Sequence, residues 1–190
     1  MDLITREELK EILEKALKIL YVKDRYLLKH NCHERSITHK LAEYLQELLP
    51  QYNVDCEYNL DIDNKDNRRK RWISQKVIEN IRQEIENSRK SLNESNWNLS
   101  EEIEKLSKGF YPDIIVHRRG SNNFNKLVIE GKKGNLNSDL DVEKLTALTS
   151  QDGEPHYRYL LGAQISFDIE NDLDITGFTP PVYYANGQQL

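Results

Sequence analysis

Two stretches near the start of the chain carry apolar residues at helical spacing. The first follows Thr5 and Glu8, which are spaced as a capping box, and its apolar positions are Leu9, Ile12, Leu13, Ala16, Leu17 and Leu20. The second covers residues 33–49, and its apolar stripe is Ile37, Leu41, Tyr44, Leu45 and Leu48. Both patterns predict amphipathic helices that pack one face against a core.

The later part of the chain carries strand patterns. Alternating or continuous apolar runs predict four strands, over residues 53–60, 113–118, 126–132 and 159–167. The segment 120–125 between the second and third of these is rich in Gly and Asn, which favours a tight connection and a hairpin. The C-terminal tail contains Pro180 and Pro181 and is expected to be irregular or to form a short edge strand.

A strongly charged segment, about residues 61–109, separates the first predicted strand from the second. An amphipathic helix is indicated within it by Ile73, Val77, Ile78, Ile81 and Ile85, and a shorter helix is expected after Ser100. We interpret the segment as an insertion in a single domain that spans residues 1–190. Its helix could lie against the core, bind DNA, or pack on a second copy of the chain or a protein partner.

The order of the predicted elements defines the expected fold class. A further helix is predicted over residues 139–149, with Val142, Leu145 and Leu148 facing inward. The chain then reads helix, strand, insertion, strand, strand, helix, strand. Because the central runs are apolar on both faces, we expect an α/β fold in which a mixed central sheet is flanked by helices.

Length and charge restrict the function classes. The chain has 190 residues, of which 31% are charged and 37% are apolar, and no apolar run approaches the roughly 18 residues of a membrane span. The first residues lack the layout of a signal peptide, so the sequence predicts a cytoplasmic protein without membrane contact. The net charge of −5 gives no global support to nucleic-acid binding. A nuclease can nevertheless be acidic, because metal ions and a few basic residues neutralise phosphate locally.

The two cysteines, Cys32 and Cys56, are expected to be reduced thiols of a cytosolic protein. Cys32 with His33 and His39 offers three groups of the kind that bind zinc. No second Cys/His pair follows at ligand spacing, so the thiol interpretation is favoured over a zinc site.

Three charged residues interrupt the two apolar strands of the predicted hairpin. Asp113 begins the first of them, while Glu130 and Lys132 lie two residues apart on the second and therefore share one face. Buried charges need a partner or a metal, and two carboxylates opposite each other repel unless a cation intervenes. Carboxylates and water are the ligands that Mg²⁺ prefers. The pattern therefore indicates a site for a hard divalent cation such as Mg²⁺ and a polarised water, with Lys132 beside it.

These residues carry a family resemblance. Pro112-Asp113, followed seventeen residues later by Glu130-Gly131-Lys132, resembles the motif of the PD-(D/E)XK nucleases. Glu34, near the start of the second helix, is similar to an additional acidic residue on the first core helix of that family. The resemblance implies a restriction-endonuclease-like core with the order α-β-[helical insertion]-β-β-α-β.

The resemblance also implies roles for these residues. Asp113 and Glu130 would be metal ligands, Lys132 the catalytic lysine, and Glu34 a ligand of a second metal or of a metal-bound water. The expected activity is a metal-dependent phosphodiester hydrolase, specifically a DNA endonuclease; RNA stays open as a substrate. The alternative is a catalytically inactive nuclease-fold module that binds nucleic acid or a protein partner.

Basic residues supply weaker candidates for nucleic-acid contacts. Lys144 on the predicted helix 139–149 resembles a polar residue that many members of the family direct at the site. Lys133 and the cluster Arg68, Arg69 and Arg71 could bind backbone phosphates, although each basic run is also typical of a solvated surface.

Overall fold

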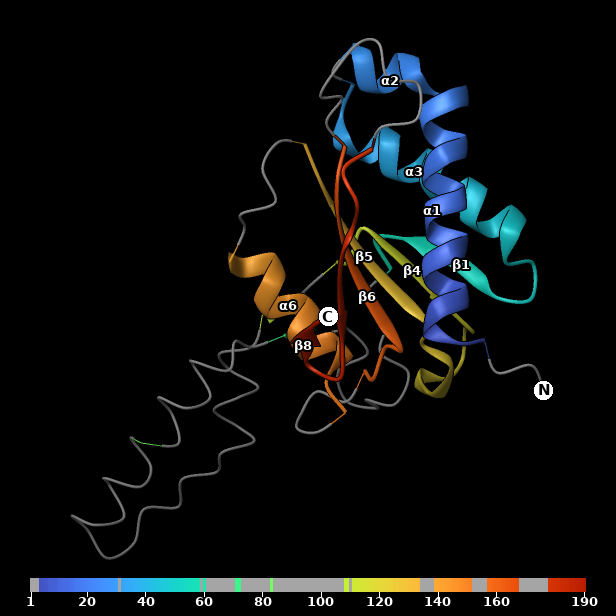
Figure 1. Cartoon of the computed structure of the whole chain (residues 1–190). Coiled ribbons are helices and arrows are strands. Elements are labelled where there is room, and N and C mark those ends of the chain that lie inside the picture. The colour runs from blue at the N-terminus through green and yellow to red at the C-terminus, as the bar shows by residue number, and fades with distance from the viewer. Residues whose placement is uncertain are drawn as a thin grey trace, which may run out of the picture.

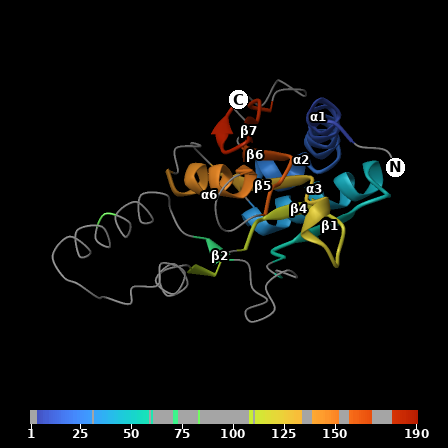
Figure 2. The same ribbon diagram turned by 90° about the horizontal axis from the view of Figure 1, so that it is seen from below.

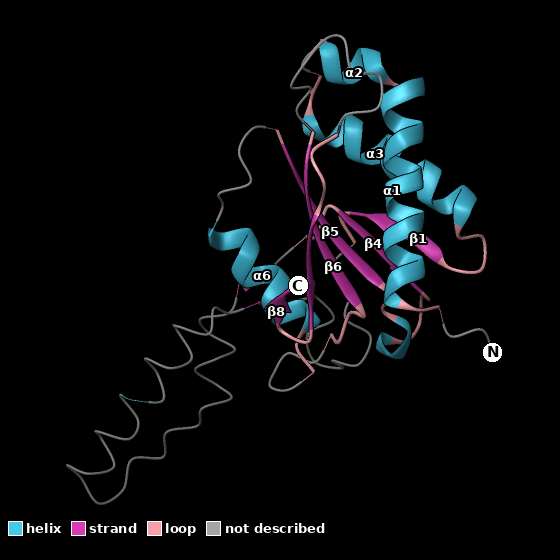
Figure 3. Ribbon diagram, in the orientation of Figure 1, coloured by secondary structure: helices cyan, strands magenta, loops and turns pink. Residues whose placement is uncertain are grey.

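The computed structural model describes residues 4–30, 32–58, 60, 71–72, 83, 108–109, 111–133, 139–151, 157–167 and 178–190. These residues form an α/β fold in which helices cover both faces of a mixed six-stranded sheet (Figure 1). Figure 3 shows the strands between α6 on one side and α1 and α3 on the other. The predicted fold class is confirmed at this level.

The sheet has the order β1-β4-β5-β6-β7-β8. Its strands are β1 (Asn53–Cys56), β4 (Ile114–His117), β5 (Leu127–Lys132), β6 (Leu161–Ser166), β7 (Val182–Ala185) and β8 (Gln188–Gln189). β5 and β6 are parallel, and every other neighbouring pair is antiparallel. β4 and β5 form the predicted hairpin, and their connection contains the short 3₁₀ helix Asn122–Phe124. A separate two-stranded sheet pairs β2 (Arg71–Trp72) with β3 (Lys108–Gly109).

The described helices are α1 (Arg6–Lys23), α2 (Arg25–Lys29), α3 (Glu34–Leu48) and α6 (Asp139–Thr149). The predicted capping box of α1 is present, because the Thr5 hydroxyl accepts from the Glu8 amide and the Glu8 carboxylate accepts from the Thr5 amide. α6 has the bounds that the sequence predicts, and α3 begins at Glu34 after His33.

Alternate residues of the central strands pack into two separate cores. On one face, Ile114 and Ile129 pack with the apolar stripes of α1 and α3. On the other face, Ile115 and Val128 pack with Leu145 of α6. Figure 2 shows this layered arrangement from below. The continuous apolar runs of the sequence arise because the strands are buried on both faces.

One strand prediction needs correction. β1 ends at Cys56 rather than at residue 60, because Glu57 adopts a left-handed backbone conformation with φ of 50°. Of the two alternatives for the C-terminal tail, the strand is present: β7 pairs with β6 on one side and β8 on the other, and the short β8 is the edge strand of the sheet. Most of the insertion 61–109 lies outside the described residues, so the predicted helices there and the single-domain interpretation stay predictions.

Gly131, between Glu130 and Lys132, has no room for a side chain. A Cβ atom there would lie 2.4 Å from the Phe167 ring and 3.3 Å from the Thr38 methyl group. We expect Gly131→Ala to lower the free energy of unfolding by about 1–3 kcal/mol, because overpacking a core forces its neighbours to shift. Urea unfolding measures this loss, and Phe167→Leu should recover part of it in the double variant. An equal loss with and without Phe167→Leu would contradict the steric explanation.

Candidate active site

Asp113 and Glu130 face each other across the β4–β5 hairpin. The antiparallel register pairs Ile114 with Ile129 and Ile115 with Val128, so the next position sets Asp113 opposite Glu130. A short hydrogen bond fixes the Asp113 side chain, because its Oδ2 accepts from the Gly131 amide at 2.7 Å. The predicted juxtaposition of the two carboxylates is therefore present.

Glu130 is buried in the sheet face that α6 covers. It alternates with Val128, which packs in the α6 core, and its own exposed fraction is 2%. Its Oε1 atom has no hydrogen-bond partner among the residues that the structure describes. Burial, reinforced by the Asp113 charge, raises the pKa of Glu130 to about 8 from its ordinary value of 4.5.

α6 adds two charged side chains to this face. The Lys144 ammonium lies 3.8 Å from Glu130 Oε2 and 3.2 Å from Asp141 Oδ1. Asp141 is 1% exposed, and its Oδ2 lies 3.5 Å from the Lys132 ammonium. Lys144 thus lies in this cluster, where it contacts carboxylates of the chain itself, and its predicted contact with nucleic acid stays a prediction.

Asp141 is the residue of this cluster that sequence reasoning missed. A signal for it exists, because Asp141 lies one helical turn before Leu145 and two before Leu148, on the buried stripe of α6. A carboxylate on an apolar stripe requires a charged partner, and Lys132 on the neighbouring strand is one of its partners.

Glu34 reaches the same region from the opposite layer. It is the first residue of α3, and its Oε2 accepts from the Lys133 amide at 3.3 Å, directly after the end of β5. Glu34 also acts electrostatically on Asp113 and on Lys132. All four residues predicted for catalysis therefore gather at one end of the β4–β5 hairpin, together with Asp141 and Lys144.

The charges in this cluster influence one another. Burial, with a contribution from the Glu34 charge, raises the pKa of Asp113 above its usual range despite the hydrogen bond from Gly131. Burial of Lys132 disfavours its ammonium, but the charges of Asp141, Glu34 and Asp113 outweigh that effect and raise its pKa. Lys132 is thus held as a cation in a cluster where burial pushes Asp113 and Glu130 toward the neutral form.

The donor set suits a hard divalent cation, because it consists of carboxylate oxygens and includes the buried, unsatisfied Oε1 of Glu130. Within the described part of the chain, no group of three or more His, Cys, Asp or Glu side chains is close enough to hold a metal ion. Asp113 and Glu130 alone offer two carboxylates. Water and phosphate oxygens would have to complete the coordination, as is usual for Mg²⁺.

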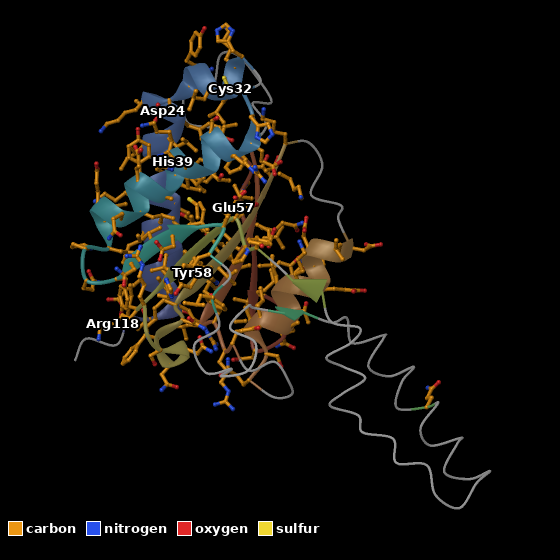
Figure 4. All side chains as sticks on the ribbon, turned by 180° about the vertical axis from the view of Figure 1, so that it is seen from behind. Asp24, Cys32, His39, Glu57, Tyr58 and Arg118 are labelled. Carbon is orange, nitrogen blue, oxygen red and sulfur yellow. The ribbon has the colours of Figure 1, made fainter. Side chains whose placement is uncertain are left out.

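Several weaker candidates lie elsewhere or are engaged in other contacts. The Lys133 amide binds Glu34, whereas Arg68, Arg69 and the side chain of Arg71 lie outside the described residues. Figure 4 shows Arg118 at the opposite end of the fold from Cys32, which precedes α3. Cys32 and Cys56 are free thiols, as predicted.

His117, at the end of β4, belongs to a separate polar contact. Its Nε2 lies 2.9 Å from Asp55 Oδ2, and Arg119 binds the same carboxylate. His117 is 3% exposed. It therefore links β4 to β1 rather than taking part in the carboxylate cluster.

The chain matches no protein family, no curated protein and no solved structure at a significant level. Among the described helices, none has both the length and the apolar character that crossing a membrane requires.

Proposed function

We propose that this chain is a metal-dependent phosphodiester hydrolase with a restriction-endonuclease-like core and that it cleaves DNA. The observation that carries the proposal is the pairing of Asp113 with Glu130 across β4 and β5, with Lys132 on the same face. The element order α3-β1-β4-β5-α6-β6 supports it, because it follows the order that the family resemblance implies.

Each charged residue of the cluster has a role in this proposal. Asp113 and Glu130 would hold Mg²⁺ or Mn²⁺. Glu34, whose carboxylate reaches the end of β5 from α3, would orient a metal-bound water or hold a second ion. The metal would supply a polarised water and Lewis-acid stabilisation of charge on the phosphate. Lys132 keeps its ammonium form because of its raised pKa, so we assign it to stabilising charge on the phosphate and orienting the attacking water.

A cleavage assay in Mn²⁺ tests this function. Its substrates are a supercoiled plasmid and single-stranded and duplex oligonucleotides, both of DNA and of RNA. Asp113→Asn keeps an oxygen that can accept the Gly131 hydrogen bond but removes the negative charge. We expect it to lower the cleavage rate at least about a hundredfold, since a metal ligand is lost. Glu143→Gln, which removes an exposed carboxylate from α6, is the matched control and should keep the wild-type rate. Equal rates for all three proteins would overturn the proposal.

A second candidate is an inactive module of the same fold that binds nucleic acid or a protein partner. One observation favours it: the ammonium groups of Lys144 and Lys132 already lie within ion-pair distance of Glu130 and Asp141 without a metal. Mn²⁺ titration separates the two candidates, because a module that only binds a partner should show no Mn²⁺ uptake that depends on Asp113. A partner contact through the insertion helix stays a prediction, as that helix lies outside the described residues.

A further inference from the structure

Lys144 is shared between two buried carboxylates. Its ammonium lies 3.2 Å from Asp141 Oδ1 and 3.8 Å from Glu130 Oε2, and its side chain is 19% exposed. Asp141 belongs to the same helix, three residues earlier, whereas Glu130 comes from the sheet. The ammonium is therefore hydrogen-bonded to Asp141 and within ion-pair distance of Glu130 at the same time.

The Glu130 contact and a metal ion exclude each other electrostatically. Mg²⁺ binds carboxylate oxygen at about 2.0–2.1 Å, so an ion on Glu130 would place two positive charges beside the ammonium in a poorly solvated site. Asp141 already holds the ammonium at the shorter distance, through a hydrogen bond of 3.2 Å. Because Asp141 is almost fully buried, solvent screens this contact only weakly.

We propose that Lys144, hydrogen-bonded to Asp141 and within ion-pair distance of Glu130, competes with a divalent cation for Glu130, and that Asp141 is a positioning residue that retains Lys144 when the cation binds. This inference rests on the proposed function and adds a means by which the site regulates its own metal affinity. Asp141 reduces the competition between Lys144 and the metal, because it holds the ammonium on its own carboxylate. Lys132, 3.5 Å from the same Asp141, is the second ammonium of the cluster.

Isothermal titration with Mn²⁺ alone tests the role of Lys144. Lys144→Met keeps most of the side-chain volume and removes the competing charge, so we expect it to bind Mn²⁺ about tenfold more tightly than the wild type. Lys40→Met, which removes an ammonium from the surface of α3, is the matched control and should leave the affinity unchanged. Unchanged or weaker Mn²⁺ binding by Lys144→Met would overturn the inference.

A double-mutant cycle tests whether Asp141 acts through Lys144. Asp141→Asn leaves Lys144 on Glu130, so we expect about tenfold weaker Mn²⁺ binding in the wild-type background but less than about threefold in the Lys144→Met background. Equal losses in both backgrounds would show that Asp141 acts through general charge or structure, and would overturn its positioning role.

The wild-type titration distinguishes a failure of this inference from a failure of the proposed function. If the wild type binds Mn²⁺ and the cycle is additive, the inference fails while the proposed function stands. If the wild type binds no Mn²⁺, both fail. Thermal melting checks that each variant is folded. If Asp141→Asn is unfolded, the Mn²⁺ affinity of Lys144→Met alone decides whether the inference stands.

Discussion

Lys132→Met is expected to lower the single-turnover rate of DNA cleavage by about a thousandfold, with little change in DNA affinity. The ammonium lies on the face that carries Glu130 and is held beside Asp141, so it can act on charge that develops in the transition state. A group that acts only in the transition state changes the rate far more than it changes binding. Rapid-quench kinetics in Mn²⁺, with enzyme in excess over DNA, measure the rate directly.

Two further variants make this prediction discriminating. Lys126→Met removes an ammonium just before the start of β5, at the other end of the strand from Lys132, and should keep the wild-type rate within about twofold. Lys132→Arg keeps the charge but cannot give up its proton near neutral pH, so partial activity would favour charge stabilisation over general-base catalysis. A wild-type rate in Lys132→Met would contradict any catalytic role for this lysine.

The sequence is sufficient to predict the central part of the site. The turn residues between β4 and β5 fix a hairpin, and the two-residue period of a strand puts Glu130 and Lys132 on one face. A hairpin of this register brings Asp113 opposite Glu130 without information from the rest of the chain. Local rules therefore predict contacts that are themselves close in sequence.

Asp141 and the pairing of the C-terminal strands were missed, although part of the signal for each is local. The helix of Asp141 was interpreted through its apolar positions alone, and its contact with Lys132 joins separate elements. The β7–β8 hairpin does carry a local signal, because Asn186-Gly187 is a two-residue loop with φ of 52° and 76°, typical of a type I′ turn. Pro180 and Pro181 obscured that signal, since prolines are unfavourable in strands. The pairing of β7 with β6 is a contact between distant segments that periodicity does not specify.

We expect Glu130 to be needed for catalysis and, once ionised, to lower the unfolding free energy of the metal-free protein. Its pKa is raised to about 8 in the folded protein from an ordinary value of 4.5, chiefly by burial. The folded state thus binds this proton more tightly than the unfolded chain does. The resulting contribution to stability is complete below about pH 4.5 and is lost as the pH rises to about 8, where the buried carboxyl group ionises. Above that pH the metal-free protein carries the cost of a buried charge.

Glu130→Gln removes that cost together with the proposed metal ligand. At pH 8.5 without metal, we expect the variant to exceed the wild type in unfolding free energy by about 2–4 kcal/mol, and the difference to shrink toward pH 4.5. Asp113, whose pKa is also raised, titrates in both proteins, but its charge acts on an ionisable residue 130 only in the wild type. Urea unfolding at several pH values measures the difference, with the exposed Glu143→Gln as a control that should follow the wild type.

Adding Mn²⁺ should reverse the order of stability. A ligand that binds only the folded state stabilises it by mass action, so Mn²⁺ should raise the wild-type unfolding free energy, whereas Glu130→Gln should respond weakly and should cleave DNA at least about a hundredfold more slowly. The combination of a more stable metal-free protein and a lost metal response distinguishes a functional carboxylate from a structural ion pair. If Glu130 served only as the structural partner of Lys144, its replacement would instead destabilise the metal-free protein at every pH, because the buried ammonium would lose a counter-ion.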